Sequence, residues 1–220
     1  GKSNATGTEN RQAFLTFGDK SWGSVKVGKD LGIFGSTAIL NDMTLLGVGN
    51  TGGGTQHNGG ANGTSTTLGG IGTGYIYADW KGQVAYTTPN MNGFQLTAGV
   101  TQPWNTTNLS DQSATASGGT DMFAVEAQAS YSWTGDFAGK VWAGFFGQEV
   151  QGLTGAGITG DTSEDASAFE VGVSTSIYNI NLVGYAYSGE GVGTTGMLSD
   201  GFSNDGKTRD SDGGYVQATY

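Results

Sequence analysis

The sequence predicts an all-β fold, specifically a transmembrane antiparallel β-barrel. Apolar and polar residues alternate through segments of about ten residues, the length of a barrel strand. Tight turns join these segments in pairs, as in Met122–Trp133 with Gly139–Val150 and in Phe169–Ile177 with Ile180–Ser188. Long loops rich in Gly, Ser, Thr, Asn and Asp separate the pairs. Short turns at one end and long polar loops at the other are typical of outer-membrane barrels.

The composition agrees with this class and argues against several others. Of the 220 residues, 42 are Gly and 2 are Pro, without the G-X-Y period of collagen. No apolar run is long enough for a transmembrane helix. The chain has no Cys, which excludes disulfides and thiolate metal sites. Its net charge of -10 argues against a nucleic-acid partner, because phosphate binding needs a basic surface.

The first predicted hairpin consists of Arg11–Phe17, a turn, and Gly23–Lys29. A long connection over residues 30–74 follows. Within it, Ser36–Leu46 is expected to form a short helix. Ser36 can cap this helix, Leu40, Met43 and Leu46 share a face, and Gly47 can end it. The remainder of the connection, to Gly74, has no periodicity and is rich in Gly, Thr and Asn.

Later segments repeat the hairpin pattern. Tyr75–Thr88 contains one strand, clearest at Gln83–Thr88, and a turn at residues 89–92 joins it to Phe94–Val100. In Phe123–Trp133 and Phe169–Ile177, one face is apolar and the other carries polar side chains, whereas the two faces of Ile180–Ser188 are ambiguous. Loops are expected at Gly152–Ala166 and Gly189–Gly213, and Gly214–Tyr220 begins a ninth strand.

Nine strands is an odd number for a barrel. Bacterial single-chain barrels have even numbers of strands, and no strand edge can stay open in lipid. The sequence is therefore expected to be one β-barrel domain over residues 1–220, incomplete in this chain. Because no signal peptide is visible, the chain is expected to be a mature protein or a piece of a longer one.

Two motifs resemble the general porins of Gram-negative bacteria. The stretch Arg11-Gln12-Ala13-Phe14-Leu15, with Phe17-Gly18 and Trp22–Lys29, is similar to the family's "R-x-A-F-V-G-L … F-G-T-V-x-V-G-R". The stretch Val84–Pro89, with Asn92-Gly93-Phe94, is similar to its "V-x-Y-x-S-P-x-F-x-G-F". The order of hairpin, long loop and second hairpin supports the resemblance, which covers most of the chain.

The resemblance implies a homotrimer of barrels of about sixteen strands, each around an aqueous channel. It identifies residues 30–74 as the loop that folds into the channel and narrows it. Acids on that loop would face bases on the wall across a pore constriction, the acids being Asp30 and Asp42 and the bases Lys26, Lys29 and Arg11. Lys stands where the family usually has Arg, and basic residues are few. The constriction is therefore less positive, which favours the passage of cations.

Each of these residues also has a simpler interpretation. Asp30 can merely end a strand, and Asp42 can lie on the solvated side of the short helix. Lys26 alternates with Val25 and Val27 and so faces the lumen, although it can also pair with a carboxylate. Lys29 shares the parity of the Val residues, so a lumen role requires the strand to bend at Gly28.

Polar residues in the middle of later strands are predicted to line the lumen. Glu126, Gln128 and Glu170 lie opposite apolar faces, and a charge facing lipid is costly. We therefore expect these three side chains to point to water. The alternative is the solvated outer face of a soluble sandwich.

The sequence predicts an outer-membrane porin for passive diffusion of small hydrophilic solutes and ions, with mild cation preference. Lipid and lipopolysaccharide are expected partners, the latter through divalent ions at acidic late loops. A secreted or surface-anchored adhesin is the alternative, although the alternation of turns and loops favours the porin. An enzyme is not expected, because His57 is the only His, and the sequence predicts no cofactor and no metal site.

Overall fold

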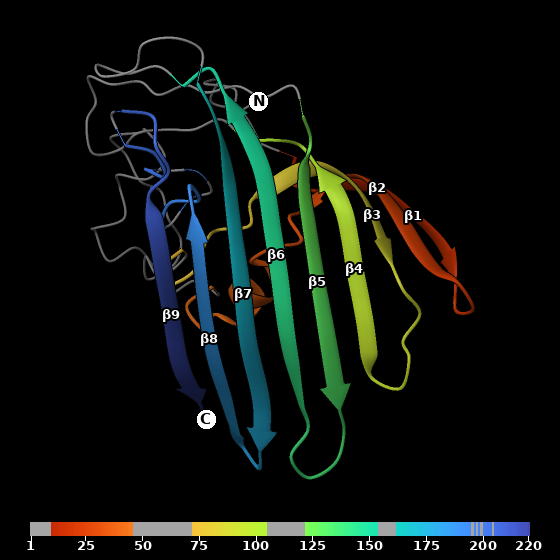
Figure 1. Ribbon diagram of the computed structural model, residues 1–220. Helices are drawn as coiled ribbons and strands as arrows, with labels where there is room; N and C mark the ends of the chain where they lie inside the picture. The colour runs from red at the N-terminus through yellow and green to blue at the C-terminus, as the bar shows by residue number, and fades with distance from the viewer. Residues whose placement is uncertain are drawn as a thin grey trace.

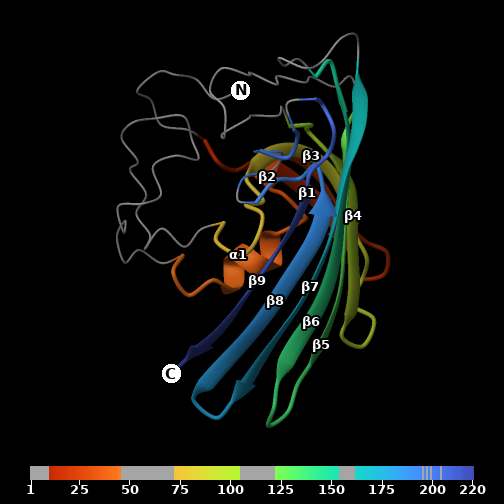
Figure 2. The same ribbon diagram turned by 60° about the vertical axis from the view of Figure 1, so that its left-hand side comes forward.

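The computed structural model describes residues 10–45, 72–104, 122–153, 162–194, 196, 198, 200–203 and 205–220. Its main feature is one sheet of nine antiparallel strands, in which every strand pairs with its neighbours in sequence (Figure 1). β1 and β9 form the two edges, so the sheet is open. The sheet is also curved, and so has a convex face and a concave face (Figure 2). The architecture is all-β and antiparallel, as predicted, and within the described residues β1 and β9 do not pair to close the sheet. The strands are β1 Ala13–Asp19, β2 Gly23–Leu31, β3 Trp80–Thr87, β4 Phe94–Thr101, β5 Ala124–Trp133, β6 Gly139–Gln151, β7 Ser163–Ile177, β8 Ile180–Glu190 and β9 Asp210–Thr219.

The predicted hairpins are confirmed, with corrections to several strand ends. β7 begins at Ser163, inside the loop predicted over Gly152–Ala166, because Ser163 to Ala166 continue the backbone ladder with β6. β9 likewise begins at Asp210, inside the loop predicted to reach Gly213. These extensions lack apolar alternation, so main-chain pairing with the neighbouring strand determines their conformation.

Tight turns join the strands at one end of the sheet (Figure 1). Ile177 pairs with Ile180, which leaves Tyr178 and Asn179 as a two-residue turn, as predicted. Tyr178 has a φ of 53°, a left-handed conformation that suits such a turn. The longer connections leave from the opposite end, so the predicted asymmetry of short turns and long loops is present.

The two faces of the sheet differ in what covers them. The convex face carries exposed apolar side chains, including Val125, Val141, Val171 and Val173. This matches the apolar set predicted from alternation, as expected for a lipid-facing surface. The ambiguity in β8 is also resolved, because Tyr185 is buried on the concave face while its neighbours in sequence lie on the other.

The segment after β2 lies against the concave face (Figure 2). It contains the helix α1, Ser36–Asn41, which is shorter than the predicted Ser36–Leu46. The N-cap is Gly35 rather than Ser36, because Gly35 adopts a left-handed φ of 77° and the Ser36 hydroxyl donates to the carbonyl of Ile33. After Asn41 the chain becomes extended at Asp42. Leu46 and Gly47 lie outside the described residues.

The hydrophobic core lies between this segment and the sheet. We call residues 32–45 the fold-back segment; residues 72–79 return beside it to β3. Phe34 packs against Phe146 of β6, with ring centroids 6.1 Å apart. Tyr75 packs edge-on against Tyr185 at 6.4 Å. Among the described residues, none of the helices has the length and apolar character needed to cross a membrane.

Candidate functional site

The start of the fold-back segment is held by two carboxylates of the sheet. Three consecutive backbone N–H groups point at the concave face. Those of Ile33 and Phe34 donate to Glu126 Oε2 of β5, at 2.7 and 2.9 Å. The N–H of Gly35 donates to Glu170 Oε2 of β7, at 3.1 Å. Ile33 and Phe34 precede α1 and Gly35 is its N-cap, so the two glutamates bind the backbone that leads into the helix.

Lys81 of β3 neutralises the charge of Glu126. Its Oε1 forms an ion pair with the Lys81 ammonium and accepts a hydrogen bond from the Thr101 hydroxyl at 2.9 Å. Glu126 is completely buried and Lys81 nearly so. A buried charge is stable only when it is paired and hydrogen-bonded, and Glu126 meets both conditions.

Glu170 is held by neutral donors. The Tyr185 hydroxyl donates to its Oε2 at 2.8 Å, and the Gln128 amide donates to its Oε1 at 3.1 Å. Gln128 in turn accepts a hydrogen bond from the Thr37 hydroxyl on α1. Gly144 leaves room for this carboxylate, because a Cβ there would lie 2.6 Å from Glu170 Oε1.

The three residues predicted to line the lumen therefore lie on the expected face, but in contact with protein. Glu126, Gln128 and Glu170 all project from the concave side of the sheet. The fold-back segment covers the two glutamates, so they bind its backbone instead of facing water. Alternation identifies the face of a strand, whereas only the folded chain shows that residues 33–35 cover it.

The two acids proposed for the constriction have different surroundings. Asp30 is buried at the end of β2, where it forms an ion pair with Lys26 and accepts a hydrogen bond from Gln12 at 2.8 Å. Asp42 is half-buried just after α1. Its carboxylate accepts hydrogen bonds from the Thr44 hydroxyl and the Tyr75 hydroxyl, each at 2.7 Å. Burial and this Asp42 contact raise the pKa of Tyr75 above its ordinary value.

The three wall bases are not gathered at one point. Lys26 and Asp30 share the concave face. Lys29 pairs in register with Gly82, on the parity opposite to Lys26, since strand pairing continues through Gly28 despite its φ of 131°. The guanidinium of the exposed Arg11 lies over the Trp80 ring, 6.0 Å from its centroid.

Sequence reasoning missed several residues of this site. Lys81 lies before the clearest part of the predicted strand and was not singled out, although it precedes Gln83 by two positions and therefore shares its face. Tyr75 belongs to an irregular stretch with no periodic signal. Tyr215, on β9, donates its hydroxyl to the Ala38 carbonyl at 2.7 Å, a contact across 177 residues that no local pattern reveals.

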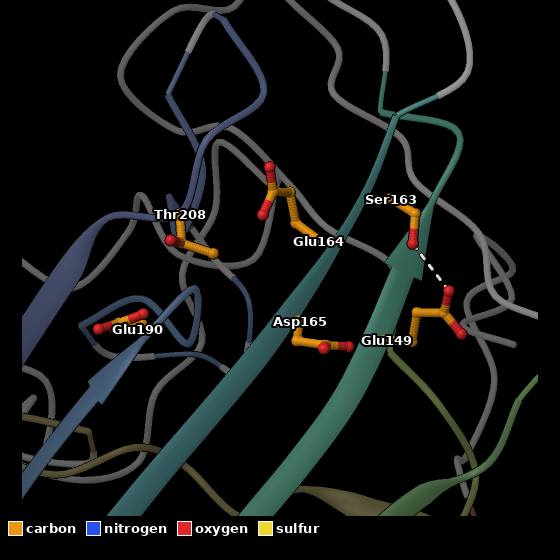
Figure 3. A pocket seen from close by; sticks show the side chains of 6 residues that line it. All are labelled: Glu149, Ser163, Glu164, Asp165, Glu190 and Thr208. Carbon is orange, nitrogen blue, oxygen red and sulfur yellow. Dashed lines mark hydrogen bonds between the residues drawn. The ribbon is translucent and has the colours of Figure 1, made fainter.

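A second feature is an acidic hollow beside β6, β7 and β8, at the end of the sheet from which the long loops leave. Figure 3 shows its lining side chains, which are Glu149, Ser163, Glu164, Asp165, Glu190 and Thr208. The Ser163 hydroxyl donates to Glu149 at 2.7 Å. Glu149 of β6 pairs with Asp165 of β7, and by alternation both lie on the convex face of the sheet. Within the described parts of the chain, no three acids or histidines are arranged to hold a metal ion.

Comparison with known proteins agrees with the fold. A family model described as Gram-negative porin matches residues 1–220. No curated protein and no solved structure matched the chain. The family is one of channels, which fits an apolar convex face and a loop segment fixed on the concave side. The chain belongs to the Gram-negative porin family.

Proposed function

We propose that this porin allows passive diffusion of small hydrophilic solutes and ions across the outer membrane, through a channel narrowed by the fold-back segment. The observation that carries the proposal is the attachment of that segment to the concave face through Glu126 and Glu170. A loop held against the inner face of the wall reduces the cross-section through which solutes pass, and so excludes large solutes.

We propose a mild preference for cations. In the described part of the concave face, Lys26 pairs with Asp30 and Lys81 pairs with Glu126, so these charges offset one another. The carboxylate of Asp42 is held by two neutral hydroxyls, and those contacts leave its negative charge uncompensated. A carboxylate beside a narrow aqueous path favours cations over anions.

Two partner relationships complete the proposal. The resemblance to trimeric general porins supports a homotrimer, which cross-linking in the membrane followed by electrophoresis can test. The acidic hollow (Figure 3) supports lipopolysaccharide contact through bridging divalent ions, because Glu149 and Asp165 lie on the same face of the sheet as the exposed Val141 and Val171. Release of lipopolysaccharide by a chelator, reduced in Glu149→Gln, would support that contact.

Planar-bilayer recording of the purified protein under a KCl gradient tests the function. We expect stepwise insertion of open channels and a reversal potential of the sign for cation preference. In Asp42→Asn that potential should move toward zero, while a matched Asp136→Asn change in the β5–β6 turn leaves it unchanged. Membrane-inserted protein without conductance would contradict the channel, and an unchanged potential in Asp42→Asn would remove Asp42 from the selectivity site.

A further inference from the structure

We propose that Gln217 of β9 is a positioning residue that fixes Asp42 relative to the wall, and so sets the ion preference of the channel. The effect of Gln217 on ion preference rests on the function proposed above, whereas its positioning of Asp42 rests on hydrogen bonds in the structure.

Gln217 holds the backbone on both sides of Asp42. Its side-chain Nε2 donates to the carbonyl of Asn41, and its Oε1 accepts the N–H of Met43 at 3.1 Å. A primary amide is planar and offers both a donor and an acceptor, so it can bind a peptide segment at two points. The residue between those two points is Asp42.

The register of β9 directs Gln217 toward the fold-back segment. Gln217 pairs with Val183, which is buried on the concave face, whereas the adjacent Val216 is 87% exposed. The contact therefore joins the last strand of the sheet to a segment about 175 residues earlier in the chain. Tyr215, two residues before Gln217 on the same face, binds the Ala38 carbonyl and steadies α1 from the same strand.

The backbone at Asp42 needs such a partner because α1 has just ended. Asp42 has a φ of -69° and a ψ of 113°, so it leaves the helical conformation. The N–H of Asp42 still donates to the Ile39 carbonyl, whereas the Asn41 carbonyl and the Met43 N–H lie beyond the helical hydrogen bonds. Thr44 and Tyr75 orient the Asp42 carboxylate, whereas Gln217 fixes the backbone that carries it.

The first test measures position without reference to ion flow. The chain has no Cys, so Met43→Cys provides a single site for a nitroxide spin label in the purified, membrane-inserted protein. We expect Gln217→Met to increase the mobility of the label. Gln95→Met is the matched control, because Gln95 also lies on the concave face but binds the Thr88 carbonyl. Unchanged mobility in Gln217→Met would overturn the proposal. Should that variant fail to assemble, Gln217→Asn keeps the amide and shortens its reach by one methylene, and the same outcomes apply.

The second test measures ion preference in a double-mutant cycle. Gln217→Met should move the reversal potential toward zero in the parent, and should have no such effect in the Asp42→Asn background. An equal shift in both backgrounds would show that Gln217 acts independently of Asp42 and would overturn the proposal. If Asp42→Asn alone has no effect, the proposed selectivity role fails, while the label mobility still decides whether Gln217 positions the segment.

Discussion

Lys81 and Glu126 form an ion pair between β3 and β5 that the fold-back segment covers, with side chains 3% and 0% exposed. The same glutamate accepts the backbone N–H groups of Ile33 and Phe34. One carboxylate therefore joins two strands of the wall to the segment proposed to narrow the channel.

Removing the charge of Glu126 should destabilise the barrel strongly. Glu126→Gln leaves the Lys81 ammonium buried without a counter-charge, a change that costs about 3–5 kcal/mol. The temperature at which the folded protein unfolds in detergent, followed by its electrophoretic mobility, measures this loss. Glu190→Gln, at an exposed strand end, should change it little. Equal unfolding temperatures for Glu126→Gln and the parent would show that the pair does not stabilise the fold.

A methyl group at Gly172 should disturb the core. A Cβ at this position would lie 2.1 Å from Cζ2 of Trp142, so the indole would have to move. Overpacking of this kind costs about 1–3 kcal/mol. We expect Gly172→Ala to lower the unfolding temperature, and Gly184→Ala to leave it unchanged, because a Cβ at Gly184 meets its nearest atom at 3.8 Å. A loss of the same size in both variants would contradict the packing described for Trp142.

A charge on the convex face should be tolerated only near the turns. Val171 lies within β7 and is 53% exposed. Val171→Lys should cost about 2–4 kcal/mol if this face meets the middle of the bilayer, whereas Ile180→Lys, at the turn end of β8, should cost less. The yield of folded protein in vesicles compares the two. Equal yields would mean that the convex face does not contact lipid.

Tyr75 should remain protonated at pH values where exposed tyrosines ionise. Burial and the bond to Asp42 raise its pKa above the ordinary value of 10.0. Because the pKa is higher in the folded state, the stabilisation from this phenol is complete below the ordinary value and is lost only as the pH rises through the folded-state pKa. Tyr75→Phe should therefore leave the ultraviolet titration of the folded protein unchanged up to about pH 11. A smaller absorbance change in the variant would show that Tyr75 ionises normally.

The strands could be predicted well, because side-chain alternation and tight turns depend only on residues close together in the sequence. Val125 and Val171 mark the lipid face by alternation with Glu126 and Glu170, and tight turns such as Tyr178-Asn179 mark the hairpins. Strand ends at Ser163 and Asp210 were missed, because pairing with a neighbour rather than side-chain pattern extends them.

The contacts of the site could not be predicted in the same way. The hydrogen bonds of Ile33 with Glu126 and of Met43 with Gln217 join residues 93 and 174 positions apart. Alternation gives the face on which Glu126 lies, but the curvature of the sheet and the path of residues 32–45 decide what covers it. The pairing of Glu126 with Lys81 depends likewise on the neighbouring strands.

The position of the fold-back segment in the ion path is the central claim, and chemical modification during bilayer recording tests it most directly. Leu40, on α1, is 66% exposed, and Leu40→Cys introduces a unique thiol. Addition of a bulky thiol reagent to open channels should lower the conductance in steps, and should leave the parent channel unchanged. Complete modification of Leu40→Cys, verified by mass spectrometry, with unchanged conductance would contradict the claim.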